Sequence, residues 1–140
     1  MLIITLVLAT VFSTFNSPTT THNFTIEVTN IKTVKGHVYF ALYNNPKNFP
    51  KGERFYKRVK VKVGKSSVRY TFKGLANGDY AVAVYHDKND DNKCNLNLIG
   101  VPTEGYGFSR NFRPILSVPK FNDCKISLNT DKTTSIKLIH

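Results

Sequence analysis

The sequence has little of the chemistry on which metal centres, redox sites and hydrolases are commonly built. It contains only two cysteines, Cys94 and Cys124, and their spacing matches neither a zinc motif nor a redox pair. It has no Gly-x-Ser-x-Gly motif and no Ser-His-Asp order. We therefore expect a non-enzymatic protein. The minor alternative is a hydrolase of transthyretin-like fold, which would need a pocket holding His86 or Asp87 with Glu104 close by.

Long apolar runs are also absent, with one exception. Residues 2–12 form an apolar run of signal-peptide length, too short to span a bilayer. We predict a signal peptide at residues 1–17, a linker at 18–23 and one domain at 24–140. No Lys or Arg precedes the run, so an apolar first strand is the alternative. We expect export to the periplasm, the cell envelope or the medium, with no membrane span in the mature chain.

Acidic residues are scarce. Nine Asp and Glu stand against 20 Lys and Arg, which gives a formal charge of +11. The basic residues concentrate between Lys47 and Lys73, which predicts a basic face. Such a face suits an anionic polymer of the cell envelope, while a solvated strand face that keeps the protein soluble is the plainer alternative. We expect no nucleic-acid partner, because no recognition motif is present.

Apolar residues recur at every second position through most of the chain. This period of two predicts strands with one buried face. About seven such segments occur, at residues 24–31, 37–44, 58–63, 68–73, 79–86, 124–129 and 135–140. We predict an all-β fold: a single antiparallel β-sandwich, immunoglobulin-like or transthyretin-like, with a long loop region at 86–123. Tyr80 follows the turn "LANGD" and is predicted to form a tyrosine corner, in which its hydroxyl bonds to upstream backbone.

Four blocks in order carry a family resemblance: "FALYNNPKNFP", "GDYAVAVYHDKNDDNK", "GVPTEGYGFSRN" and "PKFND". With them the chain resembles domain of unknown function family 2141 over roughly residues 24–140. The resemblance implies an exported bacterial β-sandwich but no activity. The chain departs from the family pattern at Cys94, Asn95 and Cys124. A missing carboxylate at position 95 weakens the expected affinity for a metal.

The stretch "DKNDDNKCN" is the candidate metal site. Asp87, Asn89 and Asp91 match the first, third and fifth positions of a calcium loop, and Lys93 would offer its carbonyl oxygen from the seventh. Asn95 would serve at the ninth. The twelfth position lacks the usual Glu, so an outside carboxylate is required, with Glu104 or Asp123 as candidates. A weak Ca²⁺ site is one interpretation, and a solvated Asx-rich turn is the other.

Two further hypotheses concern the long loop region. Tyr106, Phe108 and Arg110 are candidate ligand-binding residues for an unknown ligand or protein partner, and Gly105 and Gly107 beside them suggest a close backbone approach. Cys94 and Cys124 are candidates for a disulfide, since exported proteins favour disulfides. The functional prediction is a ligand- or partner-binding module that uses the loops at one end. The alternative is an envelope module that contacts anionic polymer through its basic strands.

Overall fold

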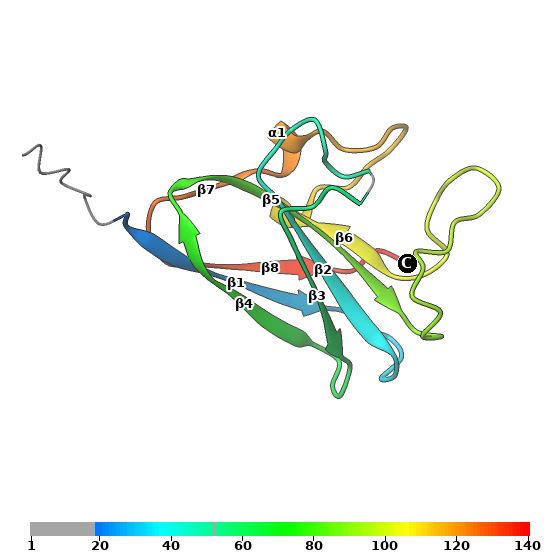
Figure 1. Cartoon of the computed structure of the whole chain (residues 1–140). Helices are drawn as coiled ribbons and strands as arrows, with labels where there is room; N and C mark the ends of the chain where they lie inside the picture. Colours follow the sequence, from blue (N-terminus) through cyan, green and yellow to red (C-terminus); the bar gives the residue numbers. More distant parts are fainter. Residues whose placement is uncertain (1–18, 52) are drawn as a thin grey trace, which may run out of the picture.

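The computed structural model describes residues 19–51 and 53–140, so the predicted signal peptide lies outside the described residues. Two β-sheets face each other and enclose an apolar core (Figure 1), which confirms the predicted β-sandwich. No helix in the described ranges is both long and apolar enough to cross a membrane. The sandwich is the frame on which the loops at each end are held.

The smaller sheet has three strands in the order β4-β1-β8. They are β1 (Thr21–Thr29), β4 (Val68–Ala76) and β8 (Lys132–Lys137). β1 pairs with β4 in antiparallel and with β8 in parallel orientation, so the prediction of a wholly antiparallel sandwich is wrong at this one pair. β1 also begins inside the segment 18–23 that was predicted to be a linker.

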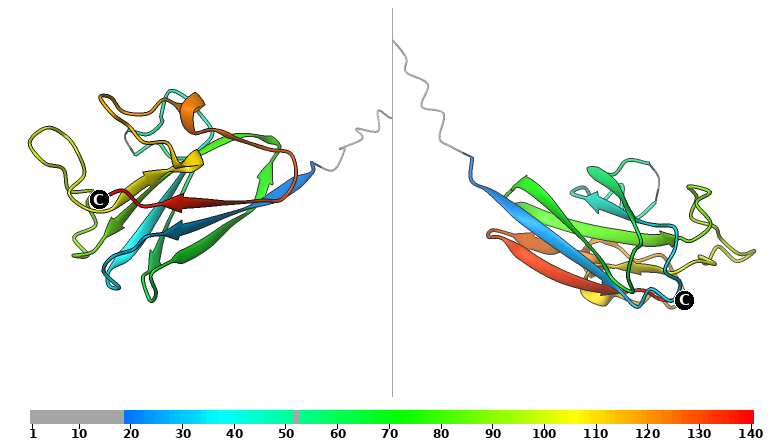
Figure 2. Two further views of the ribbon diagram at one scale, coloured as in Figure 1. Left: turned by 180° about the vertical axis from the view of Figure 1, so that it is seen from behind. Right: turned by 90° about the horizontal axis from the view of Figure 1, so that it is seen from below.

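The larger sheet has the order β3-β2-β5-β6, and β7 also pairs with β5. Its strands are β2 (His37–Tyr43), β3 (Lys57–Lys62), β5 (Gly78–Asp87), β6 (Tyr106–Phe108) and β7 (Ile126–Leu128). The prediction placed β6 in the long loop region. Its backbone runs close to β8, because a Cβ on Gly107 would lie 2.7 Å from the Ile136 side chain. The C-terminus lies beside β6, where Tyr106 pairs with Ile139 (Figure 2).

The core between the sheets follows from the period of two. Alternate residues of each strand point inward, so Phe24, Ile26 and Val28 of β1 meet Phe40 and Val82 of the facing sheet. A single sheet could not shield these side chains from water on its own. Burial of apolar surface from both sheets therefore fixes the register of every long strand.

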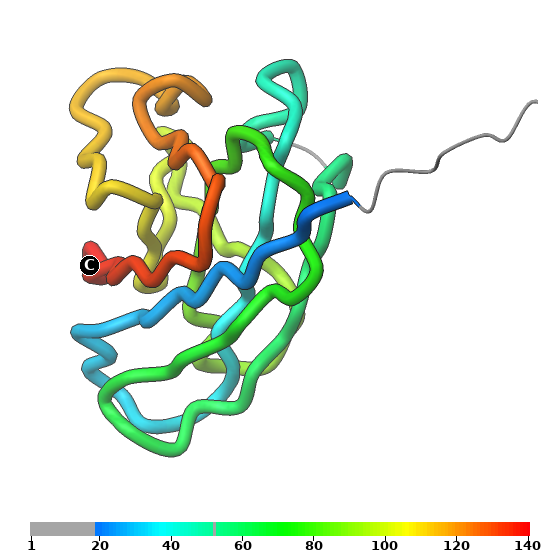
Figure 3. Tube along the Cα trace, turned by 90° about the vertical axis from the view of Figure 1, so that its left-hand side faces the viewer, coloured from blue at the N-terminus to red at the C-terminus, as the bar shows by residue number. Residues whose placement is uncertain are grey.

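A second apolar cluster lies on the outer face of the larger sheet. Phe49 and Phe121, from two loops, cover Tyr43 of β2 and Ala81 of β5 there. Figures 1 and 3 show these loops, residues 44–50 and 112–124, at the same end of the molecule. The second loop follows the short helix η1 (Ser109–Asn111) and ends in the helix α1 (Phe121–Cys124). This part of the long loop region is packed structure.

The turn between β4 and β5 carries the bond expected of a tyrosine corner. The hydroxyl of Tyr80 donates to the Ala76 carbonyl oxygen at 2.9 Å, and the ring of Tyr80 is buried. Burial raises the pKa of Tyr80, so the hydroxyl keeps its proton and remains a donor at neutral pH. The bond ties the start of β5 to the end of β4.

We predict that Tyr80→Phe lowers the free energy of unfolding by about 1 kcal/mol, because it removes one hydrogen bond without changing the packing of the ring. Urea denaturation measures the change. Tyr56→Phe is the control, since Tyr56 is 46% exposed and its ring lies against that of Tyr80. Equal effects of the two substitutions would show that the Tyr80 hydroxyl has no special role.

Candidate functional site

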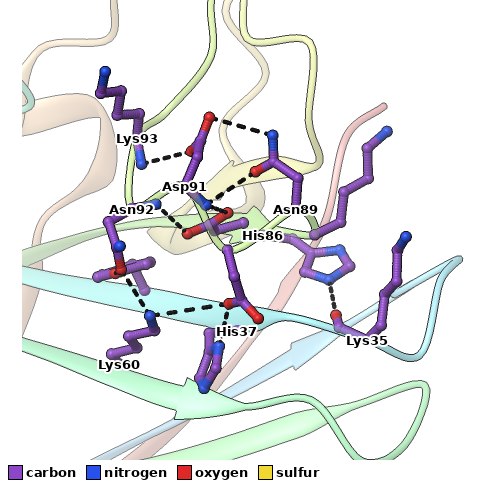
Figure 4. A network of polar contacts seen from close by, with 12 residues as sticks. Lys35, His37, Lys60, His86, Asn89, Asp91, Asn92 and Lys93 are labelled. Atoms are coloured by element: carbon purple, nitrogen blue, oxygen red, sulfur yellow. Dashed lines mark hydrogen bonds and ion pairs between the residues drawn. The ribbon is translucent and has the colours of Figure 1, made fainter.

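The Asp/Asn-rich loop (residues 88–95), which carries Asn89, Asp91 and Asn92 (Figure 4), begins where β5 ends and is folded onto the carboxylate of Asp87. Asp87 is fully buried. Its Oδ1 accepts a hydrogen bond from the Asp91 amide at 3.2 Å, and its Oδ2 accepts one from the Asn92 amide at 2.8 Å. Hydrogen bonds to a carboxylate are stronger than those between neutral groups. One buried side chain therefore holds the loop closed.

Further hydrogen bonds turn the polar side chains of the loop toward one another. The Oδ1 of Asn89 accepts from the Asp91 amide at 3.3 Å, and the two carboxylate oxygens of Asp91 accept from the Lys93 amide at 2.9 Å and the Asn95 side chain at 2.8 Å. The bonds from Asn95 and Lys93 hold the pKa of Asp91 below its ordinary value, so Asp91 is ionised at neutral pH. Asn92 takes a φ of 63°, the left-handed conformation that suits the sixth position of a calcium loop.

The pairing of β5 with β6 delivers Glu104 to the base of this loop. The His86 amide donates to the Gly105 carbonyl at 2.7 Å, so the neighbouring Glu104 reaches the level of Asp87. Glu104 is only 4% exposed, and its Oε1 accepts from the Lys88 amide at 3.0 Å. Its Oε2 is buried without a hydrogen-bond partner in the described part of the chain. A buried carboxylate oxygen left in this state is rare and calls for an explanation.

The predicted metal ligands are brought together only in part. Within residues 19–51 and 53–140, no three His, Cys, Asp or Glu side chains form a group that could hold a metal ion. The side-chain oxygens of Asp91 are turned toward Lys93 and Asn95 instead. Asp123, the other candidate carboxylate, accepts the Lys120 amide at the start of α1 and belongs to another part of the fold. Glu104 is therefore the outside carboxylate that reaches the loop.

The predicted disulfide between Cys94 and Cys124 is wrong, because both cysteines are free. Cys124 is buried against Ala81 near the start of β5, whereas Cys94 lies in the loop that follows the end of β5. Partial desolvation and the nearby charge of Glu104 raise the pKa of the Cys94 thiol. The two cysteines therefore lie toward opposite ends of β5, whose six steps from Ala81 to Asp87 span about 20 Å. A disulfide requires the two Cα atoms to lie within roughly 7 Å of each other.

Of the three predicted ligand-binding residues, two lie side by side on β6 and the third lies in η1. Tyr106 and Phe108 both project from the outer face of β6, with their ring centroids 6.1 Å apart. Phe108 also packs edge-on against Phe49, so part of its role is structural. Arg110 lies exposed in η1. A pocket of about 120 Å³ lies beside Phe108, which is below the usual size of a small-molecule site.

Sequence reasoning missed an aromatic and basic group on the outer face of the larger sheet. Arg58 of β3 lies 4.4 Å from the ring centroid of Tyr39 and donates to the Tyr85 hydroxyl at 2.8 Å. The rings of Tyr39 and Tyr85 are stacked, with centroids 4.7 Å apart. Burial raises the pKa of Tyr85 to about 12. The alternation of "RVKVKV" placed Arg58 and Lys60 on one face, but the sequence does not reveal which strands pair with β3.

The predicted basic face is divided between the two sheets. β3 pairs with β2 of the larger sheet, and β4 pairs with β1 of the smaller one. Arg58, Lys60 and Lys62 therefore lie on one outer face, while Arg69 lies on the other and forms an ion pair with Glu27 at 3.3 Å. The chain crosses from one sheet to the other between β3 and β4.

Two further features bear on function. His86 is buried, and its Nε2 lies 2.8 Å from the Lys35 carbonyl oxygen, so its ring is hydrogen-bonded at the edge of the core.

A shallow cleft of about 460 Å³ opens between residues 46–51 and 118–122, with Phe49 and Phe121 in its floor. No sequence motif pointed to this cleft, because its walls come from two loops without periodicity.

Comparison with known proteins gives one kind of match. A family model described as "uncharacterized protein conserved in bacteria (DUF2141)" matches residues 26–137. No curated protein and no solved structure matches the chain. The matched range runs from β1 to the end of β8 and includes the whole Asp/Asn-rich loop.

We predict that Asp87→Ala lowers the free energy of unfolding by about 3 kcal/mol, because two charge-assisted hydrogen bonds are lost at a buried site. Asp87→Asn should cost less, since its amide oxygen can still accept one of the two bonds. Urea denaturation gives the free energies, and hydrogen exchange at Asp91 and Asn92 reports the loop directly. Unchanged exchange in Asp87→Ala would contradict the role given to this carboxylate.

Proposed function

This chain belongs to the DUF2141 family of uncharacterised bacterial proteins, so we propose a function from its own candidate site. We propose that it is a non-enzymatic binding module in which the segment at residues 87–104 binds Ca²⁺. The non-enzymatic character is supported by His86, whose ring is buried and engaged with backbone. We also propose that the protein works outside the cytoplasm, in keeping with the apolar run at residues 2–12.

The observation that supports Ca²⁺ most strongly is the unpartnered Oε2 of Glu104. A carboxylate can only accept hydrogen bonds or bind a cation, and no donor reaches this oxygen from the described residues. The Oε1 of the same group accepts a hydrogen bond from the amide of Lys88, the first residue after β5. A cation at the base of the loop would satisfy Oε2.

The chemistry of the neighbouring groups favours Ca²⁺ over other metals. Asp87, Asn89, Asp91 and Asn95 all offer oxygen, which is the ligand that hard cations prefer, and Lys93 can add its carbonyl oxygen. No thiolate or imidazole is needed, and Ca²⁺ tolerates the irregular geometry of a loop. Asp91 would have to turn from Asn95 toward Glu104, so part of the binding free energy is consumed in rearrangement. We expect a dissociation constant on the order of 10⁻⁴ to 10⁻³ M, as in extracellular modules.

We predict that Ca²⁺ at 100 times its dissociation constant stabilises the protein by about 2.7 kcal/mol. Thermal unfolding in millimolar Ca²⁺ and in EDTA measures the gain, and calorimetric titration gives the affinity. Glu104→Gln should abolish most of the gain, because it removes the charge but leaves an oxygen that can accept the Lys88 bond.

The matched control is Asp131→Asn, which removes an exposed carboxylate from the turn before β8 and should keep the full Ca²⁺ response. Identical melting temperatures in Ca²⁺ and EDTA for the unmodified protein would sink the proposal. So would a full response in Glu104→Gln.

A second candidate function is contact with an anionic polymer of the cell envelope. Arg58, Lys60 and Lys62 line up on the outer face of β3, and the first two lie over the ring of Tyr39. Because the Tyr39 ring already holds the Arg58 and Lys60 side chains in place, these side chains lose less conformational entropy when a polyanion binds.

We predict that removing two charges from this face, in Arg58→Gln with Lys62→Gln, weakens binding to dextran sulfate more than Arg69→Gln with Lys73→Gln does. Both double variants lower the net charge equally, but the second lies on the smaller sheet. Retention on a dextran sulfate column over a salt gradient compares them. Equal losses would mean that only net charge matters, with no specific face.

A further inference from the structure

The hairpin at residues 95–103 is an ordered projection beyond the end of the sandwich. Its two arms are joined by the amide of Thr103, which donates to the Asn95 carbonyl at 2.8 Å, and by a bridge between Leu96 and Pro102. The Asn97 side chain caps the turn by accepting the Val101 amide at 2.9 Å. Figures 1 and 2 show the loop standing clear of both sheets.

The tip of this hairpin is apolar and fully open to water. Leu98 and Ile99 are 106% and 83% exposed, and Leu96 and Val101 beside them are 57% and 40% exposed. Single exposed apolar residues are common, but four within six positions form a patch. The internal hydrogen bonds keep these side chains directed outward, so collapse onto the core is not open to them.

We propose that this hairpin inserts its tip into the surface of an anionic lipid bilayer. A specific protein interface needs about 800 Å² on each partner, which is more than one convex tip of four side chains provides. A convex apolar tip suits the boundary between headgroups and acyl chains, which has no fixed shape. Naming an anionic bilayer as the partner deepens the proposed function. Only the effect of Ca²⁺ on attachment to the bilayer rests on that function.

The charges around the hairpin fit a negatively charged surface. The lysines that strand pairing or hydrogen bonding places next to the loop are Lys35, Lys60, Lys62, Lys88 and Lys93, and the acids there are Asp87, Asp90, Asp91 and Glu104. Five positive charges against four negative ones leave a small excess. A bound Ca²⁺ adds two positive charges to this end, so Ca²⁺ should strengthen attachment to anionic headgroups.

The chain has no tryptophan, which allows a direct test. Leu98→Trp places a single fluorophore at the tip of the hairpin. With vesicles of phosphatidylcholine and phosphatidylglycerol, its emission should shift to shorter wavelength, more strongly in Ca²⁺ than in EDTA. Leu116→Trp is the matched control, because Leu116 is 97% exposed on a different loop, and its emission should stay unchanged.

A second variant measures affinity. Leu98→Ser with Ile99→Ser should weaken co-sedimentation with these vesicles by more than ~10-fold, because two apolar side chains no longer enter lipid. Ile115→Ser with Leu116→Ser should bind as the unmodified protein does. No emission shift in Leu98→Trp would overturn the proposal, as would a shift without lipid that grows with protein concentration, which would indicate a second copy of the chain.

The two proposals fail in different ways. If the loop does not bind Ca²⁺, vesicle attachment is the same in Ca²⁺ and EDTA but still depends on Leu98 and Ile99. If the hairpin does not enter lipid, calorimetric titration in the absence of vesicles still detects Ca²⁺, while Leu98→Trp reports no change. Equal loss of binding in both double-serine variants would also contradict insertion by this hairpin.

Discussion

The hydrogen bonds to the buried carboxylate of Asp87 are the interaction on which the structure of the Asp/Asn-rich loop depends. Asp87 is the last residue of β5, a central strand of the larger sheet, and it accepts the amides that close the Asp/Asn-rich loop. The turn before β2 is built around the same residue, since a Cβ on Gly36 would lie 2.1 Å from the Asp87 carbonyl oxygen. A rigid strand end and a closed loop are thus joined at one side chain.

That junction arranges the rest of the site. The ladder from β5 to β6 sets Glu104 at the base of the loop, and the hairpin at residues 95–103 continues outward from it. One strand pairing therefore places a carboxylate oxygen that has no partner among the described residues at the base of the polar loop, and it carries an apolar tip into solvent. Cation uptake and attachment to a surface would be neighbouring events on one rigid frame.

The strands with strict alternation could be read from the sequence, because burial of one face demands a period of two, as at Val59 and Val61 of β3. The tyrosine corner at Tyr80 could be predicted from the turn that precedes it. β6 could not, since a strand of three residues with a glycine in the middle carries too little pattern. The parallel pairing of β8 and the cover of Phe49 and Phe121 depend on long-range packing that no local signal encodes. The spacing of Asp87, Asn89 and Asp91 located the candidate site, but the distance between Cys94 and Cys124 is set by the whole fold.

We propose that Glu104 Oε2 and the Asp/Asn-rich loop share a cation. The most direct measurement is a crystal structure of the protein grown in millimolar Ca²⁺. We expect a Ca²⁺ ion within about 2.3–2.6 Å of Glu104 Oε2 and of the Asp91 carboxylate. A structure in which Oε2 keeps no partner, or accepts only a water while Asp91 stays bonded to Asn95, would contradict it.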